Sequence, residues 1–418
     1  MLNKNLLLIL FLFIALNLPA QTILSYVDST QVNGAQIWGG ISWNGSAINI
    51  TTMMSTQIHL RKFDTNLNDL STDVQLTSSS DYQGTNIADH KHVYLNGYLY
   101  VTFMTGGNQE LYLLKTDSAG NRMKITTLET LNNNSYLTND MHLVTDSNFL
   151  YVIYPKITGG LATEKRVRKY NLDLDSIDTY EAVSPIAVAN LGNVFYKDSS
   201  FYMFTGNETQ NDLIVSHWNK NWTAQTNFDD TLIKSVNGEW HYFSTGIAYD
   251  TANSLWYIAY HIMLPNSQPD HETLWLAVFD SNFNLLENQQ FATPAHFRPH
   301  LLLHNGYLYV VYDGTGVTIK KYKVDASSIS KITNLSNLND LKVFPNPFVN
   351  KLHIACDNNF TFPVQAKLYN QMGEYLGNFN CNKTEQELDL SYLPIGFYYF
   401  TIKNKNCISA IKLIKTSN

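Results

Sequence analysis

The feature of this sequence that most limits its fold is a short pattern that recurs along the chain. An Asn-Gly turn and a run of aromatic and β-branched residues occupy positions 95–101 and again positions 304–310. Asn-Gly favours a two-residue hairpin turn, and the run after it is typical of a buried strand. Weaker copies lie at 44–50, 146–152, 198–204 and 253–258. With the first residue after each turn as the anchor, the copies start at 47, 98, 149, 201, 255 and 307, at steps of 51, 51, 52, 54 and 52 residues.

Each of these six units is predicted to hold four strands. In the second unit, strand-like runs lie at 86–95, 98–105, 110–117 and 121–130. Four antiparallel strands in a repeating unit are typical of a β-propeller. An array of β-sandwiches is the alternative, but it would need larger units and true linkers. The fold class is therefore predicted to be all-β, with a six-bladed β-propeller at residues 21–326.

The two ends of the repeat region are expected to meet in one sheet. The last unit offers strands only at 299–304, 307–313 and 317–325, and a lone strand-like run lies at 22–28, before the first unit. An open ring would leave two unpaired sheet edges, which invite aggregation. We therefore expect the N-terminal strand to close the ring.

Composition supports this class and excludes one kind of partner. Tyr (26) and Phe (21) are abundant, as strands prefer, in a chain of 418 residues. Charged residues make up only 15% and the formal charge is −7, without a Lys/Arg cluster. Nucleic-acid binding needs a basic surface, so no nucleic acid is expected as a partner.

The N-terminus has the pattern of a secretory signal peptide. Lys4 supplies positive charge, residues 6–18 are apolar, and Pro19-Ala20 marks a cleavage site. The apolar run is short for a membrane span, although an uncleaved anchor is the alternative. We expect residues 1–20 to be removed, which leaves no transmembrane segment.

The pattern changes after the repeat region. Residues 327–340 are rich in Ser and Asn and are interpreted as a linker. Residues 341–418 contain strand-like runs at 351–356, 364–370, 397–403 and 408–415, which fit a small β-sandwich. The chain's three cysteines lie here, at Cys356, Cys381 and Cys407, and their spacing leaves the disulfide state open.

Short motifs in this last region resemble a known family. They are Phe344-Pro345-Asn346-Pro347, then 368–373 with Gly373, then Asp389-Leu390-Ser391, then 393–398 with Pro394, Gly396 and Tyr398, and finally 411–415 with Lys412 and Lys415. In this order they closely resemble the type A C-terminal sorting domain of the type IX secretion system. Phe344 stands where that family usually carries Tyr. An ordinary immunoglobulin-like accessory domain is the alternative.

This resemblance implies a route out of the cell. It implies a protein of the Bacteroidetes group that reaches the periplasm through its signal peptide and is then carried across the outer membrane by the type IX machinery. The sorting domain, an immunoglobulin-like β-sandwich, is usually removed, and the cargo is released or anchored to surface lipopolysaccharide. The expected location is therefore the cell surface or the medium.

Candidate site residues come from the inner strands of the ring. The first strand of each propeller unit lines the central channel, and alternate side chains point into it. Alignment of these strands on the anchors sets His92, His142 and His300 at equivalent positions. Two residues earlier lie His90, Asp140 and Arg298. Asp89 is expected to lie one residue off this face.

These six side chains allow three interpretations. Three imidazoles and a carboxylate suit a divalent metal such as Zn²⁺, with His92, His142 and His300 as ligands, although no cofactor is predicted. The same groups suit acid–base chemistry, with Arg298 holding a sugar carboxylate. They also suit a water-filled channel in which polar groups bind water and backbone.

The predicted function is that of a secreted or surface binding module for an extracellular glycan or protein. No motif of a known catalytic spacing occurs, and propellers are widely used for binding. The alternative is a secreted glycoside hydrolase or lyase that uses the channel residues. Hydrolases of this kind need two carboxylates, and the channel strands offer Asp140 and Asp89.

Overall fold

The structure is a computed structural model of a chain with two compact units, Met1–Ala326 and Ser327–Asn418. It describes residues 22–70, 73–82, 86–106, 110–130, 141–158, 161–183, 192–206, 211–235, 240–263, 273–292, 298–313, 316–326, 341–356, 364–370, 375–381, 383–404 and 407–416. The signal peptide predicted at 1–20 and the linker predicted at 327–340 lie outside these ranges.

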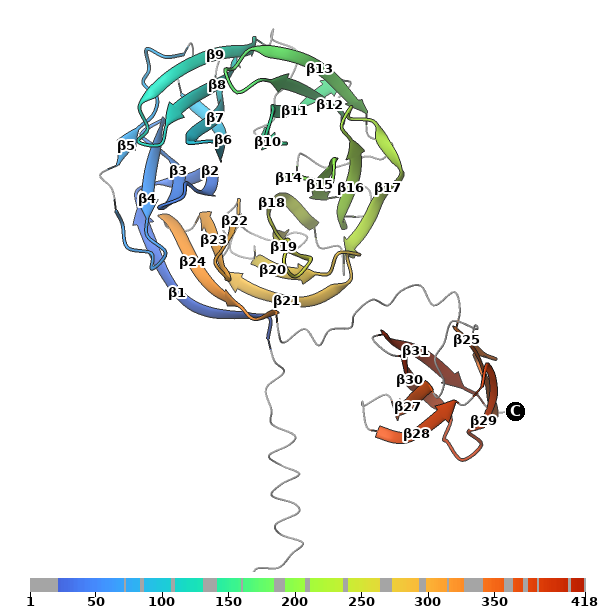
Figure 1. Ribbon diagram of the computed structural model, residues 1–418. Helices are drawn as coiled ribbons and strands as arrows, with labels where there is room; N and C mark the ends of the chain where they lie inside the picture. The colour runs from blue at the N-terminus through green and yellow to red at the C-terminus, as the bar shows by residue number, and fades with distance from the viewer. Residues whose placement is uncertain are drawn as a thin grey trace, which may run out of the picture. The chain divides into compact units, whose positions relative to one another are not determined.

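The described part of the first unit consists of β-strands in six four-stranded antiparallel sheets, which surround a common centre (Figure 1). Sheet 1 holds β2 (Gln36–Trp43), β3 (Ile48–Met54), β4 (Gln57–Phe63) and β5 (Val74–Gln75), and sheet 2 holds β6 (Ile87–Leu95), β7 (Tyr98–Thr105), β8 (Glu110–Asp117) and β9 (Arg122–Thr130). Sheet 3 holds β10 (His142–Thr145), β11 (Leu150–Thr158), β12 (Leu161–Tyr170) and β13 (Ser176–Val183), and sheet 4 holds β14 (Val194–Lys197), β15 (Ser200–Gly206), β16 (Leu213–Asn219) and β17 (Ala224–Ile233). Sheet 5 holds β18 (Trp240–Asp250), β19 (Leu255–Met263), β20 (Thr273–Phe279) and β21 (Leu285–Ala292). Sheet 6 joins β22 (His300–His304), β23 (Tyr307–Asp313) and β24 (Gly316–Val324) to the N-terminal β1 (Leu24–Asn33).

The Asn-Gly hairpins form as their sequence predicts. Asn96 and Gly97 both have positive φ, at 52° and 89°, as do Asn305 and Gly306, at 49° and 74°. A two-residue turn of this kind matches the twist of the two strands it joins, and Asn and Gly tolerate it best. The four strands of sheet 2 begin and end within one residue of their predicted positions.

The N-terminal strand completes the last sheet. Strand β1 pairs antiparallel with β24 from Leu24↔Val324 to Asn33↔Gly316. This confirms that the N-terminal segment supplies the fourth strand of the last sheet, although β1 runs to Asn33 rather than ending at residue 28 as predicted. In Figure 1 the first strand therefore lies beside one of the last strands of the same unit.

The apolar core of the first unit lies between neighbouring sheets. Between sheets 6 and 1, for example, Tyr309 and Val311 pack against Ile48, Ile50 and Phe63. A fully buried apolar side chain of this size contributes roughly 1.5–3 kcal/mol. The indole rings of Trp218, Trp222 and Trp256 belong to two further clusters of this kind. Each sheet is thus held mainly by its two neighbours.

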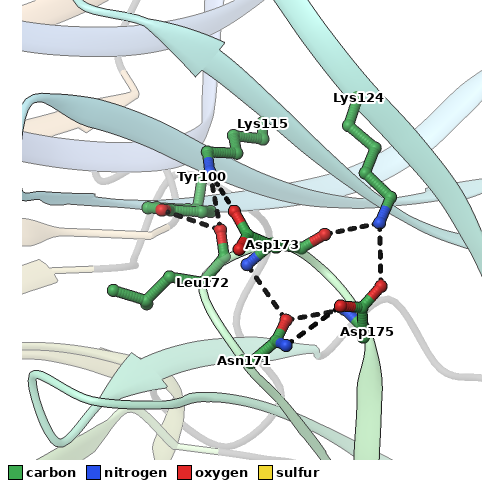
Figure 2. Close-up of polar contacts among 7 residues, drawn as sticks. All are labelled: Tyr100, Lys115, Lys124, Asn171, Leu172, Asp173 and Asp175. Atoms are coloured by element: carbon green, nitrogen blue, oxygen red, sulfur yellow. Dashed lines mark hydrogen bonds and ion pairs between the residues drawn. The ribbon is translucent and has the colours of Figure 1, made fainter.

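Polar contacts reinforce these junctions. In the turn between β12 and β13, the side-chain oxygen of Asn171 accepts hydrogen bonds from the backbone N–H groups of Asp173 (3.0 Å) and Asp175 (2.8 Å). Two side chains of sheet 2 donate to the carbonyl of Leu172 in this turn, Tyr100 at 3.1 Å and Lys115 at 2.8 Å (Figure 2). The β12–β13 turn of sheet 3 is therefore hydrogen-bonded to side chains on the face of sheet 2.

The second unit contains a three-stranded and a four-stranded sheet among its described residues. The first joins β25 (Leu341–Phe344), β26 (Lys351–Cys356) and β29 (Glu385–Asp389), and the second joins β28 (Tyr375–Cys381), β27 (Val364–Asn370), β30 (Gly396–Asn404) and β31 (Cys407–Lys415). One apolar cluster takes side chains from both sheets, including Leu352 from β26 and Phe400 from β30. Strands β26 and β27 have the predicted bounds. The side chains of the three cysteines lie outside the described residues.

Several residues of the sorting motif hold this unit together. The ammonium of Lys415 is buried and donates to the carbonyl of Leu390 at 2.7 Å and to that of Ser391 at 3.2 Å. The side chain of Asn346 accepts from the backbone of Ile414 at 2.9 Å, and the Tyr398 hydroxyl donates to the carbonyl of Pro394 at 2.6 Å. Gly373 and the side chain of Lys412 lie outside the described residues.

Candidate functional site

The inner strands of the first unit enclose a cavity of about 290 Å³. Strands β2, β6, β10, β14, β18 and β22, one from each sheet, contribute to its wall. The wall includes Gly39, Gly40 and Ile41; Lys91, His92 and Val93; Leu143, Val144 and Thr145; Asn193, Val194, Phe195 and Tyr196; Ile247; and His300 and Leu301. A cavity at the meeting point of several sheets is the usual place for a ligand site.

The cross-strand register corrects the predicted alignment of the inner strands. In sheet 6, the cross-strand pairs are counted from His304↔Tyr307, the pair next to the Asn-Gly turn. The fourth pair after it is His300↔Val311. The fourth pair after Leu95↔Tyr98 in sheet 2 is Lys91↔Thr102, not His92↔Val101. The prediction that His92 is equivalent to His300 is therefore wrong by one residue, and a one-residue shift reverses the face of a strand. His142, paired with Ile153, keeps its place.

The same shift puts Asp89 on the face of β6 that carries Lys91. Asp89 lies two residues before Lys91, as Arg298 lies two residues before His300. The Asp89 carboxylate is fully buried and accepts from the Lys91 ammonium at 3.2 Å and from the backbone N–H of His90 at 2.7 Å. Burial raises the pKa of Asp89, while the charges of Lys91 and Arg298 oppose that rise. Asp89 and Lys91 could have been found from the sequence if the residues of each inner strand had been counted from the hairpin of that strand.

His92 is held at the junction of sheets 1 and 2. Its Nδ1 atom forms a hydrogen bond with the hydroxyl of Thr51 at 2.7 Å, and its Nε2 atom forms one with the hydroxyl of Ser42 at 2.9 Å. Burial lowers the pKa of His92 to about 3, so the ring is neutral at physiological pH. The ring lines the cavity, but both of its nitrogens already form hydrogen bonds with Thr51 and Ser42.

His90 fills a space that a glycine leaves for it. A Cβ atom on Gly39 would lie 2.3 Å from Nε2 of His90 and 1.9 Å from Oγ1 of Thr51. The ring is fully buried, and neither ring nitrogen has a hydrogen-bond partner of good geometry among the described residues. Burial lowers the pKa of His90 well below its ordinary value, and the charge of Lys91 acts in the same direction.

His300 also lies near the charge of Lys91. Burial and then the nearby charge of Lys91 lower the pKa of His300 well below its ordinary value, with smaller effects from His92, His90 and Arg298. Arg298 itself has a positive φ of 67°, an uncommon conformation for a bulky residue. On this side of the cavity, buried imidazoles therefore lie near the charged groups of Lys91, Arg298 and Asp89.

The predicted site residues are thus brought together only in part. His92 and His300 line the cavity, and His90 lies behind them against sheet 1. His142 is buried at the start of β10, and Asp140 lies outside the described residues. Among the residues that the structure describes, no group of three or more His, Cys, Asp or Glu side chains is arranged to hold a metal ion.

Fold and site together define an all-β protein of four-stranded sheets around a cavity whose wall is partly polar and partly apolar. Residues 342–416 match the family model of the secretion system C-terminal sorting domain. This confirms the resemblance drawn from the motifs. Such a tail implies export to the cell surface or into the medium, with the type IX secretion machinery as a partner. In the described part of the chain, no helix is long and apolar enough to span a membrane.

Several solved structures are distantly similar to this chain. No curated protein matches. A member of the DUF4221 family from Bacteroides vulgatus is similar at 12% identity with a TM-score of 0.44, over 72% of this chain and 98% of that one. A GH43 β-xylosidase/α-arabinofuranosidase from a compost metagenome is similar at 12% identity with a TM-score of 0.42, over 63% and 98%. An exo-β-1,3-galactanase from Phanerochaete chrysosporium is similar at 9% identity with a TM-score of 0.42, over 92% and 95%. Scores at this level carry no argument about function.

Proposed function

We propose that residues 21–326 form a six-bladed β-propeller that binds an extracellular glycan in its central cavity. The observation that carries this proposal is the cavity itself, to which the inner strand of every sheet contributes. Ligand pockets measure about 300–1,000 Å³, so a cavity of about 290 Å³ suits a small ligand such as a terminal sugar. In this proposal, the signal peptide at 1–20 is removed, and the immunoglobulin-like sandwich at 341–418 directs secretion by the type IX machinery.

The chemistry of the wall favours an acidic sugar. The Lys91 ammonium, the imidazole of His300 and the amide of Asn193 offer hydrogen-bond donors, while Leu143 and Ile247 offer apolar surface. Such a mixture of apolar walls and a few polar groups is typical of small-molecule sites. The ammonium of Lys91 on the wall and the nearby guanidinium of Arg298 would attract a carboxylate on the ligand.

A glycan array tests this proposal. The protein without residues 1–20, and thus with its second unit, is applied to neutral and acidic glycans, beside the variants Lys91→Gln and His300→Gln. We expect binding to acidic glycans by the wild type and at least about tenfold weaker binding by Lys91→Gln, as the loss of a charge-assisted hydrogen bond implies. His353→Gln, which changes an exposed histidine of the second unit, is the matched control. Equal binding by all variants would contradict the proposed site.

A secreted glycoside hydrolase or lyase is the second candidate. The observation that favours it is Asp89, a buried carboxyl group with a raised pKa, as a proton donor requires. Such an enzyme would need a second carboxylate, for which Asp140, outside the described residues, is the candidate. Release of reducing sugar from a glycan that the array identifies, and its loss in Asp89→Asn, would establish catalysis. Binding without release would leave a binding module.

The sorting assignment is tested by deleting residues 341–418. We expect the truncated protein to stay in the periplasm, because it lacks the segment that matches the sorting domain. Cell fractionation and immunoblotting measure this directly. Undiminished secretion of the truncated protein would contradict the assignment of the second unit as the export address.

A further inference from the structure

Two junctions between neighbouring sheets share one polar arrangement. At the junction of sheets 2 and 3, Tyr100 pairs across the strands with Lys115, and both donate to the carbonyl of Leu172 (Figure 2). The Lys115 ammonium lies 4.5 Å from the centre of the Tyr98 ring. The lysine head therefore occupies a small site made of an aromatic face and a turn carbonyl.

The junction of sheets 6 and 1 repeats this arrangement. Tyr309 pairs with Lys321, and the two donate to the carbonyl of Thr65 at 3.1 Å and 2.7 Å. The Lys321 ammonium lies 4.3 Å from the centre of the Tyr307 ring. The turn that receives them begins at Asp64, whose side chain accepts from the backbone of residues 66 and 68, as Asn171 does in sheet 3.

The junction of sheets 4 and 5 keeps the tyrosine and the facing turn but differs at two positions: Ser200 stands where Tyr98 and Tyr307 stand, and a histidine replaces the lysine. Tyr202 pairs across the strands with His217, at the place that a lysine takes elsewhere. The facing turn begins at Asp280, whose side chain accepts from the backbone of Asn282 at 2.8 Å and Asn284 at 2.9 Å. His217 is shorter than lysine, and its Nε2 atom lies 3.2 Å from the carboxylate of Asp230 on its own sheet.

A cavity of about 310 Å³ lies at this junction. Its wall is made of Lys197, Tyr202, His217, Asp230, Trp256, Ser281, Asn282 and Phe283. The aromatic rings around His217 include Tyr202, at a centroid distance of 5.1 Å, and Phe283, at 5.9 Å. The Lys197 ammonium forms an ion pair with Asp198. Asp230, whose side chain is 56% exposed, is the acidic residue of this wall and lies beside His217.

We propose that this second cavity binds a primary alkylammonium group, which would lie where Lys115 and Lys321 place their own ammonium heads at the two sister junctions. Aromatic faces, a turn backbone and a carboxylate are the groups that recognise such a cation. The ligand is either a free amine or the lysine side chain of another protein, since both carry the same group. The site lies between the outer parts of two sheets and is independent of the central cavity.

The test uses the full chain and n-butylammonium, which reproduces the lysine side chain from Cβ to the ammonium. We expect a saturable rise in melting temperature with n-butylammonium and none with n-butanol at equal concentration. The variant His217→Lys supplies its own ammonium, so we expect its melting temperature to exceed that of the wild type and to be unaffected by the amine. A rise that n-butanol matches, or one that persists in His217→Lys, would overturn the proposal.

A second pair of variants tests the site without relying on the folding of His217→Lys. Asp230→Asn removes the carboxylate from an exposed side chain, and we expect up to about fivefold weaker binding of n-butylammonium. Asp229→Asn, on the neighbouring position of the same strand, is the matched control and should bind as the wild type does. Equal affinity of the two variants would contradict the site. Parallel titrations with cadaverine and with N-acetyl-lysine amide then assign the natural source to a free amine or to a protein side chain.

Discussion

The two sides of the central cavity are built on different principles. On the side of sheets 6, 1 and 2, the imidazoles of His92 and His300 line the wall, and hydrogen bonds such as that between Thr51 and His92 hold them. On the side of sheets 3, 4 and 5, the wall is mainly apolar, as at Leu143 and Ile247. A polar wall depends on partners and protonation states, whereas an apolar wall depends on volume.

The largest expected difference between the two sides is their response to pH. Burial lowers the pKa of His90, His92 and His300, while the unfolded chain protonates them near pH 6.5. Below about pH 6.5 the unfolded state therefore binds more protons than the folded state. The free energy of unfolding is highest above about pH 6.5 and falls as the pH decreases from there toward about 3. Each ring contributes up to about 1.4 kcal/mol per pH unit, or about 4 for the three. Asp89, with its raised pKa, opposes this trend.

Urea unfolding between about pH 7.5 and 5.5 measures this slope. The seven tryptophans all lie in the first unit, so their fluorescence reports on the sheets around the cavity and not on the sorting domain. His300→Gln should flatten the slope, and the exposed His353→Gln should leave it unchanged. A stability that does not depend on pH in this range would contradict the neutral buried histidines.

The next largest effect is expected from Gly39→Ala. The added methyl group would meet Thr51 and His90 at less than normal contact distance, and overpacking of this kind costs about 3 kcal/mol. Gly45→Ala is the comparison, because nothing lies within 4 Å of a Cβ atom there and only the positive φ of 94° is strained, at about 1–2 kcal/mol. Equal costs for the two variants would show that sheets 1 and 2 do not approach as closely as described.

A single hydrogen bond on the polar side is tested by Thr51→Val. This change keeps the shape and leaves Nδ1 of His92 without its partner, which costs about 2 kcal/mol for a buried group. Thr52→Val is the matched control, because the Thr52 hydroxyl is buried and has no hydrogen-bond partner among the described residues. We expect the control to be neutral or slightly stabilising in urea unfolding. The reverse order of the two variants would refute the role of Thr51.

The smallest effect is expected on the apolar side. Ile247→Val removes one methylene group from the cluster between sheets 4 and 5, which costs about 1 kcal/mol. Because no charge or hydrogen bond is involved, the slope of stability against pH should stay that of the wild type. A changed slope in this variant would mean that the two sides are coupled more closely than their contacts indicate.

Sequence patterns predicted the local structure well and the site only in part. Strands β6 to β9 lie within one residue of their predicted bounds because Asn-Gly turns and alternating runs act over a few residues. The predicted face of β6 was displaced by one residue, which put His92 in the place of Lys91 and left Asp89 out. Side-chain direction changes at every residue of a strand, so a small error in alignment exchanges the whole face.

The sequence by itself determined the repeat, the strand that completes the last sheet and the sorting motif at 342–416, because each of these rests on short-range patterns or on spacing. Only the tertiary structure decided which neighbours the inner side chains meet. The close approach of Gly39 to His90 and the second cavity beside His217 depend on how two sheets pack, and such contacts join residues that are far apart in the chain. Packing distances of this kind follow from sheet twist and side-chain volume together, which no local pattern records.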